Sequence, residues 1–299
     1  MVTNKSVASY YNASAKDYNK QYKRDSLTDV NIHYPANYFR LQLLLNSFAN
    51  KGVKRVIEIG VGEGTPLSTL EKSGIDIYGI DISHEMVKKS KDMMRNIGMD
   101  PNKIAWGDIQ DPITYSHAFK EGQFDALVAM GVMPHVRNDS QVLTNMKALI
   151  KPGGSVFIEF RNKLFSLFTF NRYTYEFIMD DLLAGVSQTL KDQVSKDLRQ
   201  RLVMEQPIPR MIHEDNDTEP GYDAILSRFH NPFEIEKTFK MLEFNDINFL
   251  WYHYHPAMPY LQKDNETLFR HESLKLEHDA LGWRGIFLCS AFIIEAVKK

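Results

Sequence analysis

The fold is decided by one stretch, Val56-Ile-Glu-Ile-Gly60-Val-Gly62-Glu-Gly64-Thr-Pro-Leu-Ser-Thr-Leu70. The β-branched residues that begin it predict a strand buried on both faces. That strand stops at Gly60, and glycines alternate at Gly60, Gly62 and Gly64 before helix-forming residues resume. Glycine adopts backbone angles that other residues avoid, and it lets a ligand lie against the main chain. Because α/β sheets bind nucleotide-like ligands at such a turn, we expect a nucleoside cofactor here.

Strands and helices alternate on either side of this stretch. Strands are predicted at 54–60, 75–82, 103–106, 124–130 and 155–160, and helices at 65–73, 84–97 and 140–150. A helix at 233–242 and strands at 247–254 and 285–297 resume the pattern near the end of the chain. The alternation predicts an α/β fold with a doubly wound, mostly parallel, seven-stranded Rossmann-like sheet.

The domain organisation follows from where this alternation is interrupted. Residues 1–50, with a helix predicted at 34–49, form an N-terminal helical lid, and residues 51–161 and 231–299 form the core. Residues 162–230 form a helical insertion, with helices at 173–186 and 190–204 and a Pro-rich, acidic link at 206–221. Since the insertion leaves from the end of the fifth strand, we expect it to cover the carboxyl edge of the sheet and the substrate.

Composition limits the classes of function. The 299 residues carry a formal net charge of −2, which gives no electrostatic basis for binding nucleic acid. The single cysteine, Cys289, excludes an intrachain disulfide and a Cys-rich zinc site, and its apolar surroundings predict a buried core residue. No apolar run is long enough to span a membrane, and the N-terminus has no signal-peptide core, so we expect a cytoplasmic protein. The sequence leaves open whether the chain forms a homo-oligomer.

The glycine spacing distinguishes between nucleoside ligands. A dinucleotide fingerprint has the spacing Gly-x-Gly-x-x-Gly, whereas here it is Gly60-x-Gly62-x-Gly64. Glu58 lies just before the turn, where its carboxylate would repel a phosphate and suit an ammonium group. Both features disfavour a nicotinamide oxidoreductase.

Four motifs, in order along the chain, resemble those of class I S-adenosylmethionine-dependent methyltransferases. They are Val-Ile-Glu-Ile-Gly-Val-Gly-Glu-Gly at 56–64, Ile-Tyr-Gly-Ile-Asp-Ile-Ser at 77–83, Gly-Asp-Ile at 107–109 and Leu-Ile-Lys-Pro-Gly-Gly-Ser-Val-Phe-Ile at 149–158. The resemblance is strong over 54–160 and looser over the last two strands. It implies S-adenosyl-L-methionine as cofactor and S-adenosyl-L-homocysteine as product.

The resemblance also implies a role for each motif position. Gly60, Gly62 and Gly64 would pass close to the methionine part and the ribose, and Glu58 would organise the turn or the amino group. Asp81 would accept hydrogen bonds from both ribose hydroxyls, which one carboxylate can do with its two oxygens.

The remaining cofactor positions concern the adenine and the sulfonium. Asp108 would accept from the adenine amino group, with Ile82 and Ile109 on either side of the ring. Met130, at the end of the fourth strand, would line the pocket beside the sulfonium.

The N-terminal segment carries an aromatic stripe, since Tyr11, Tyr18 and Tyr22 recur at helical spacing. One interpretation is that the stripe docks this segment on the core. The other is that Tyr11 and Tyr22 belong to a lid over a cationic cofactor, because aromatic faces attract cations.

Methyl transfer to oxygen requires a base, and histidine is the usual one near neutral pH. His135 follows the fourth strand directly beyond the cofactor pocket, and it is a candidate for the base, for substrate contact or for a structural hydrogen bond. His253 and His255 lie at the end of the sixth strand, where they predict a catalytic or substrate contact or, less readily, a metal pair. His213 belongs to the insertion and is a candidate substrate contact.

Two further residues are candidates for binding the acceptor. Arg161 leads out of the fifth strand and would clamp a carboxylate or phosphate, or else form an ion pair within the insertion. Tyr173 lies in an aromatic part of the insertion that is either core or acceptor pocket.

The predicted function is methyl transfer to an oxygen, in preference to a nitrogen, of a small acceptor that is sugar-like or anionic. The alternatives are a methyltransferase acting on RNA or protein, and a non-catalytic protein that binds S-adenosylmethionine as a partner or sensor.

Overall fold

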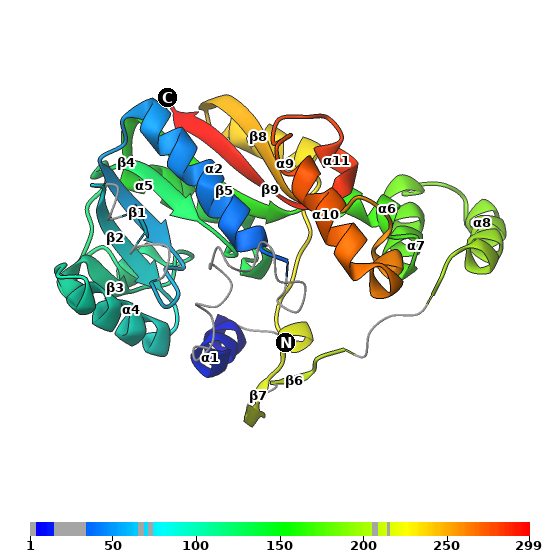
Figure 1. The fold of residues 1–299 in the computed structure, drawn as a ribbon, viewed down its shortest axis with the longest axis horizontal. Helices are drawn as coiled ribbons and strands as arrows, with labels where there is room; N and C mark the ends of the chain where they lie inside the picture. Colours follow the sequence, from blue (N-terminus) through cyan, green and yellow to red (C-terminus); the bar gives the residue numbers. More distant parts are fainter. Residues whose placement is uncertain (1–3, 15–33, 65–68, 71–73, 205–208, 214–215) are drawn as a thin grey trace.

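The computed structural model describes residues 4–14, 34–64, 69–70, 74–204, 209–213 and 216–299 (Figure 1). Its main sheet has seven strands in the order β3-β2-β1-β4-β5-β9-β8. Their bounds are Arg55–Ile59 (β1), Asp76–Asp81 (β2), Ile104–Trp106 (β3), Phe124–Ala129 (β4), Ile150–Arg161 (β5), Phe244–Tyr254 (β8) and Cys289–Lys298 (β9). Strand β9 runs antiparallel to its two neighbours, and the other pairs are parallel. The predicted fold class is confirmed.

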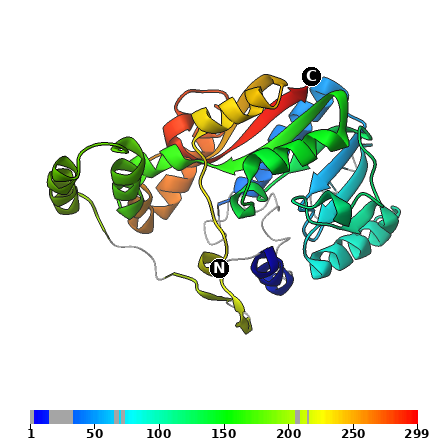
Figure 2. The same cartoon turned by 180° about the vertical axis from the view of Figure 1, so that it is seen from behind.

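Helices cover both faces of this sheet. Helices α2 (Ala36–Lys51) and α4 (His84–Asn96) bury their apolar side chains in one core cluster. Helices α5 (Asp139–Leu149) and α9 (Pro232–Met241) bury theirs in the other. Figure 1 shows α2 and α4 in front of the sheet, and Figure 2, the view from behind, shows α5 and α9 in front. Because both faces of the sheet are covered by helices, the central strands β1 and β4 consist mostly of hydrophobic residues.

Local sequence signals set several helix boundaries. The side chain of Ser83 accepts a hydrogen bond of 3.1 Å from the backbone N–H of Met86 and so caps the N-terminus of α4. Asn138 and Asn231 cap α5 and α9 in the same way. The N-termini of these helices are thereby fixed close to the carboxyl ends of the strands. The helix predicted at 65–73 falls largely outside the described residues.

The insertion after β5 begins with helices and ends in a hairpin. Its helices are α6 (Ser166–Thr169), α7 (Arg172–Glu176), a π-helical turn (Phe177–Leu182) and α8 (Gln188–Arg201). Strands β6 (Ile212–His213) and β7 (Asn216–Pro220) then pair as a separate two-stranded sheet, where only an irregular link was predicted. Helix α1 (Asn4–Ser14) contacts β7, and both lie below the main sheet in Figure 1.

Three other sequence predictions need correction. The strand predicted at 155–160 starts earlier, because the Lys-Pro-Gly-Gly segment at 151–154 belongs to β5, whose register against β4 shifts there. The last strand starts later than predicted, because Gly285–Leu288 forms the short helix α11. An apolar run suits a strand or a buried helix equally, so periodicity could not separate the two. Helix α10 (Glu266–Leu276) was not predicted.

Short 3-10 turns connect these elements. They span Pro101–Lys103, Pro112–Thr114, Met133–His135, Lys163–Phe165, Tyr222–Ala224 and Pro259–Asp264. Within the described part of the chain, no helix combines the length and the apolar character needed to cross a membrane.

Candidate active site

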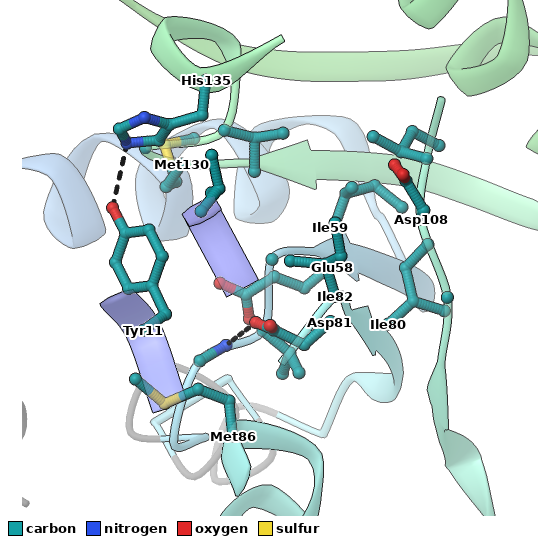
Figure 3. Close-up of a pocket in the computed structure, with 18 of the residues that line it drawn as sticks. Tyr11, Glu58, Ile59, Ile80, Asp81, Ile82, Met86, Asp108, Met130 and His135 are labelled. Carbon is teal, nitrogen blue, oxygen red and sulfur yellow. Dashed lines mark hydrogen bonds between the residues drawn. The ribbon is translucent and has the colours of Figure 1, made fainter. Parts of the chain in front are cut away.

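A pocket opens at the carboxyl ends of β1, β2 and β4 (Figure 3). Its empty volume is about 950 Å³, including the open mouth. The lining includes predicted cofactor residues from the first three motifs, from the end of β4 and from the N-terminal segment: Tyr11, Glu58, Gly60, Gly62, Asp81, Ile82, Asp108, Ile109 and Met130. The structure therefore brings together in one pocket most of the residues that the resemblance selected.

The glycine turn is held by backbone geometry that only glycine adopts without strain. Gly60, Gly62 and Gly64 have φ angles of 72°, 57° and 89°. A Cβ on Gly60 would lie 2.7 Å from a Val132 methyl group. Gly64 is not among the lining residues and instead packs against Ser90 of α4, so it shapes the turn from behind.

Asp81, at the end of β2, has both carboxylate oxygens hydrogen-bonded to the backbone. One oxygen accepts from Gly62 N at 2.9 Å and the other from Ser83 N at 2.8 Å. Burial raises the pKa of Asp81 to about 6, and the backbone donors oppose that rise. Each oxygen keeps acceptor capacity for a ligand hydroxyl.

Glu58 presents an unsatisfied carboxylate to the pocket. Its Oε2 is buried and has no hydrogen-bond partner among the described residues. Burial raises the pKa of Glu58 to about 8, while Arg40 lowers it and Asp81 raises it further. An orphaned buried acceptor beside a glycine turn suits an ammonium group, which would supply both the missing donor and the countercharge.

The three residues that the resemblance assigns to the adenine, Ile82, Asp108 and Ile109, all line the pocket. Figure 3 shows two of them, Ile82 and Asp108. Asp108 accepts a hydrogen bond of 2.9 Å from Gln110 N, which fixes the loop after β3. Met130 lines the pocket at the end of β4, as predicted.

Helix α1 contributes Val7 and Tyr11 to the pocket lining. The Tyr10 ring packs at 5.2 Å from His213 and 5.5 Å from Tyr222, so the hairpin side of the insertion supports the helix. His213, predicted as a substrate contact, therefore contacts α1. Tyr22 lies outside the described residues.

His135 lies in the 3-10 turn after β4 and lines the same pocket. Its Nδ1 is 2.6 Å from the carbonyl oxygen of Leu226, and its Nε2 is 3.0 Å from the hydroxyl of Tyr11 (Figure 3). A carbonyl only accepts, so Nδ1 carries the proton and Nε2 presents a lone pair. Burial lowers the pKa of His135 to about 4, and Arg161 lowers it further. The ring is therefore neutral at physiological pH.

His253 and His255 lie away from this pocket, in a smaller cavity at the end of β8. Their ring centroids are 4.9 Å apart. Among the described residues, no group of three or more His, Cys, Asp or Glu side chains is arranged to hold a metal ion. The structure therefore separates these two histidines from His135, although the sequence placed all three at one edge.

The two predicted acceptor residues differ in position. Arg161 donates a hydrogen bond of 2.5 Å to Ser227, and its guanidinium lies over the Tyr222 ring at 4.9 Å. Arg161 therefore packs on Tyr222 and lies close enough to His135 to affect the pKa of that ring. Tyr173 is 42% exposed and packs on Phe229 at 6.0 Å, outside the pocket lining.

Sequence reasoning missed three contributors to the site. Arg40 of α2 forms an ion pair of 2.5 Å with Glu159 of β5, and its charge lowers the pKa of Glu58. Tyr222 packs against Arg161, and the backbone of Leu226 fixes the tautomer of His135. A carbonyl contact across 91 residues leaves no signal in one sequence.

Comparisons with known proteins agree with this geometry. A family model described as a methyltransferase domain matches residues 32–196 of the 299. The chain is 28% identical over 134 residues to a ubiquinone biosynthesis O-methyltransferase of Dechloromonas aromatica, covering 44% of this chain and 55% of that protein. It is 25% identical over 220 residues to the enzyme of that name from Vibrio parahaemolyticus, covering 73% and 84%.

A third relative has a different printed activity. It is a phosphatidylethanolamine N-methyltransferase of Cereibacter sphaeroides, 28% identical over 139 residues, with 46% of this chain and 65% of that protein covered. The chain therefore spans 55% of the length of the Dechloromonas aromatica protein and 65% of the length of the Cereibacter sphaeroides protein.

Solved structures support the fold. The geranyl diphosphate C-methyltransferase of Streptomyces coelicolor A3(2) superposes with a TM-score of 0.52 at 12% identity, covering 99% of this chain and 98% of that one. A chain from the complex of the Haloferax volcanii Trm112 activator with a putative methyltransferase gives 0.51 at 14% identity, covering 96% of each.

The chemistry of the pocket fits S-adenosylmethionine. The orphaned Glu58 oxygen matches its ammonium group, Asp81 its ribose hydroxyls, and the turn at Gly60 leaves the backbone bare for close approach. With the family model matching more than half of the chain, the protein belongs to the methyltransferase-domain family, as a class I S-adenosylmethionine-dependent member.

Proposed function

We propose that this protein transfers a methyl group from S-adenosylmethionine to a hydroxyl oxygen of a small acceptor, with His135 as the base. The observation that carries the proposal is the tautomer of His135. Its Nδ1–H donates to Leu226 O, which leaves the Nε2 lone pair directed at a hydroxyl, that of Tyr11, within the pocket. The Tyr11 hydroxyl marks the position where an acceptor hydroxyl would bind.

The bound cofactor supplies an electrophilic methyl group on a positively charged sulfur, and the sulfur leaves as a neutral thioether. The residues of the chain hold the donor, align it with the acceptor and accept the proton. Glu58 and Asp81 fix the two ends of the donor, and alignment of donor and acceptor contributes several kcal/mol in favourable cases. An O–CH3 bond forms as the S–CH3 bond breaks, and the acceptor proton passes to Nε2 of His135.

The low pKa of His135 is compatible with this role. A hydroxyl oxygen that has gained a methyl group carries positive charge and is a strong acid, so a weak base suffices to take its proton. Because the ring stays neutral at physiological pH, Nε2 keeps its lone pair, which an acceptor hydroxyl would engage in place of the Tyr11 hydroxyl. Arg161, close enough to lower the pKa of His135, also disfavours the imidazolium until an anionic group of the acceptor compensates.

Two observations support a small acceptor rather than a macromolecule. Tyr11 of α1 lines the pocket, and Tyr222 packs at 6.0 Å on the His135 ring, so aromatic side chains crowd the space around the proposed base. The formal net charge of −2 offers no general attraction to nucleic acid. The relatives named for ubiquinone biosynthesis and phosphatidylethanolamine are likewise named for small-molecule or lipid methylation.

The test is a screen with labelled methyl donor, using small-molecule fractions of a cell extract as acceptors. We expect label to enter a hydroxylated compound with the wild-type protein and to fall sharply with His135→Ala. A product methylated on nitrogen would contradict O-methylation. Equal transfer by the variant would remove His135 from the base role.

A further inference from the structure

A second cavity lies at the end of β8, and it shares no lining residue with the donor pocket. Its empty volume, including the open mouth, is about 280 Å³. Tyr34, His255, Gln262, Phe269, Arg270 and Ser273 line it, together with His253 and Tyr254.

His255 is the unexplained group in this cavity. Both ring nitrogens are shielded from solvent, and neither has a hydrogen-bond partner among the described residues. Burial and the neighbouring His253 lower the pKa of His255 well below its ordinary value, so the ring is neutral. A neutral imidazole offers one donor and one acceptor. Leaving both hydrogen bonds unmade is unfavourable, and a ligand that supplied them would recover that free energy.

The charges around His255 favour an uncharged ligand. Arg270 lines the cavity, and Glu277 is hydrogen-bonded to two lining residues, its Oε1 accepting from the Tyr34 hydroxyl at 2.9 Å and from Tyr254 N at 2.8 Å. Its Oε2 is buried and has no partner among the described residues. Burial raises the pKa of Glu277 to about 7. The Nδ1 of His253 is already hydrogen-bonded to Ser290 at 2.8 Å. An anion would meet the Glu277 carboxylate and a cation would meet Arg270, whereas hydroxyl groups can both donate and accept.

The walls of the cavity are partly aromatic. Tyr34 stacks on His253 at 5.4 Å with an interplanar angle of 8°, and Phe269 packs edge-on to His255 at 6.1 Å. Aromatic side chains present broad apolar faces. The polar groups of Gln262 and Ser273 complete a mixed surface that a hydroxylated ring matches.

The cavity and the donor pocket lie at the same edge of the sheet. Strand β8 runs parallel to β4 and β5, and its carboxyl end is three strand positions from that of β4. At about 4.8 Å per position, the two ends are roughly 14 Å apart. An acceptor that touches both places must be longer than a single sugar ring.

We propose that this cavity binds an uncharged hydroxylated ring, such as a sugar, at the end of the acceptor remote from the methylated atom. This inference rests on the proposed function for the identity of the ligand as acceptor. Binding in the cavity itself does not require methyl transfer, so the two can be tested separately.

The experiment titrates maltose, cellobiose, lactose and methyl α-mannoside into the full chain and follows the amide signals of α10 by NMR. We expect saturable shifts with at least one probe. His255→Phe, which removes both ring nitrogens, and Gln262→Ala, at the exposed rim where folding is undisturbed, should each weaken that binding by about tenfold. His271→Phe, an exposed histidine on the same helix, is the matched control and should bind as the wild type does.

Each outcome decides the proposal. Absence of saturable shifts with every probe, or unchanged binding in both His255→Phe and Gln262→Ala, would overturn it. Probe binding, combined with no entry of label into any compound of the extract screen, would support the cavity and reject the proposed function. Conversely, once an acceptor is identified, His255→Phe must raise its KM and leave S-adenosylmethionine affinity unchanged; an unchanged KM would reject the cavity and leave the proposed function standing.

Discussion

The donor pocket and the second cavity, which contains His255, lie at one edge of the same sheet. The titratable groups buried in the first include acidic side chains, whereas those buried in the second include basic side chains. In the donor pocket the buried titratable groups are carboxylates, and burial raises the pKa of Glu58 to about 8 and of Asp81 to about 6. In the cavity they include two imidazoles, and burial lowers the pKa of His253 to about 4. Burial favours the neutral form in both places, so the pKa values move in opposite directions.

This difference indicates what each site binds. A carboxylate held partly neutral by burial gains its charge back when a cation arrives, as Glu58 would with an ammonium group. A neutral imidazole without partners gains most from hydroxyls. His135 stands between the two cases, because it is a neutral imidazole in the donor pocket whose hydrogen bonds are made by Leu226 and Tyr11.

The largest effect should come from removing the base. His135→Ala should lower turnover by about 10²- to 10⁴-fold, the usual contribution of general base catalysis, with donor affinity changed by no more than about twofold. Steady-state kinetics and calorimetry measure the two quantities. The matched variant His255→Phe should keep turnover at saturating acceptor. A reversal, with His255→Phe inactive and His135→Ala active, would exchange the roles of the two sites.

The next effect concerns the donor. Asp81→Ala should weaken S-adenosylmethionine binding about tenfold or more, because a hydrogen bond to a charged group contributes about 1.5–3 kcal/mol. Calorimetry gives the affinity. Asp76→Ala, at the opposite end of the same strand, is the control and should bind normally. Unchanged affinity in Asp81→Ala would reject the assignment of Asp81 to the ribose.

Glu58 predicts a proton linkage. Below pH 8 the donor-free Glu58 is largely protonated, and an ammonium partner favours its carboxylate, so donor binding at pH 7 should release up to about one proton. Calorimetry in buffers of different ionisation enthalpy counts that proton, and Glu58→Gln should abolish its release. Release that persists in Glu58→Gln would assign the proton to another group.

The same carboxyl affects stability without the donor. The folded pKa of Glu58 is raised, so its stabilising contribution is complete below the unfolded pKa of about 4.5 and is lost as the pH rises through 8. Thermal unfolding of wild type and Glu58→Gln between pH 5 and 8 should therefore differ in slope, with the variant less sensitive to pH.

The smallest effect is expected at His253. Its folded pKa is depressed to about 4, so its contribution is present above the unfolded value of 6.5 and is lost as the pH falls through 4. His253→Asn suits the positive φ of 61° at this position, since Asn tolerates that region. The variant should lose less stability than wild type between pH 6.5 and 4 in thermal unfolding. An unchanged slope would show that His253 does not titrate with unfolding.

The sequence predicted the donor pocket better than the rest of the chain. Alternating strands and helices, the glycine turn and Asp81 all carry local signals, because each depends on residues within a few positions of itself. The cavity does not, since it joins Tyr34, the end of β8 and α10, which are far apart in the chain. Helix α11 was predicted as strand because an apolar run has no period that separates the two.

The roles of the histidines show the same limit. Sequence position placed His135, His253 and His255 together at the carboxyl edge. Only the structure shows that Leu226 holds Nδ1 of His135 and that His255 has no partner among the described residues. Long-range backbone contacts and unpaired buried atoms depend on how distant segments pack together. The pattern of neighbouring residues in the sequence does not predict that packing.

The most direct test of the account is a crystal structure of the protein with S-adenosylmethionine. We predict the ammonium group at Glu58 Oε2, the ribose hydroxyls at Asp81, the adenine between Ile82 and Ile109, and the methyl group facing His135. A donor bound elsewhere, or turned so that its methyl group faces away from His135, would contradict it.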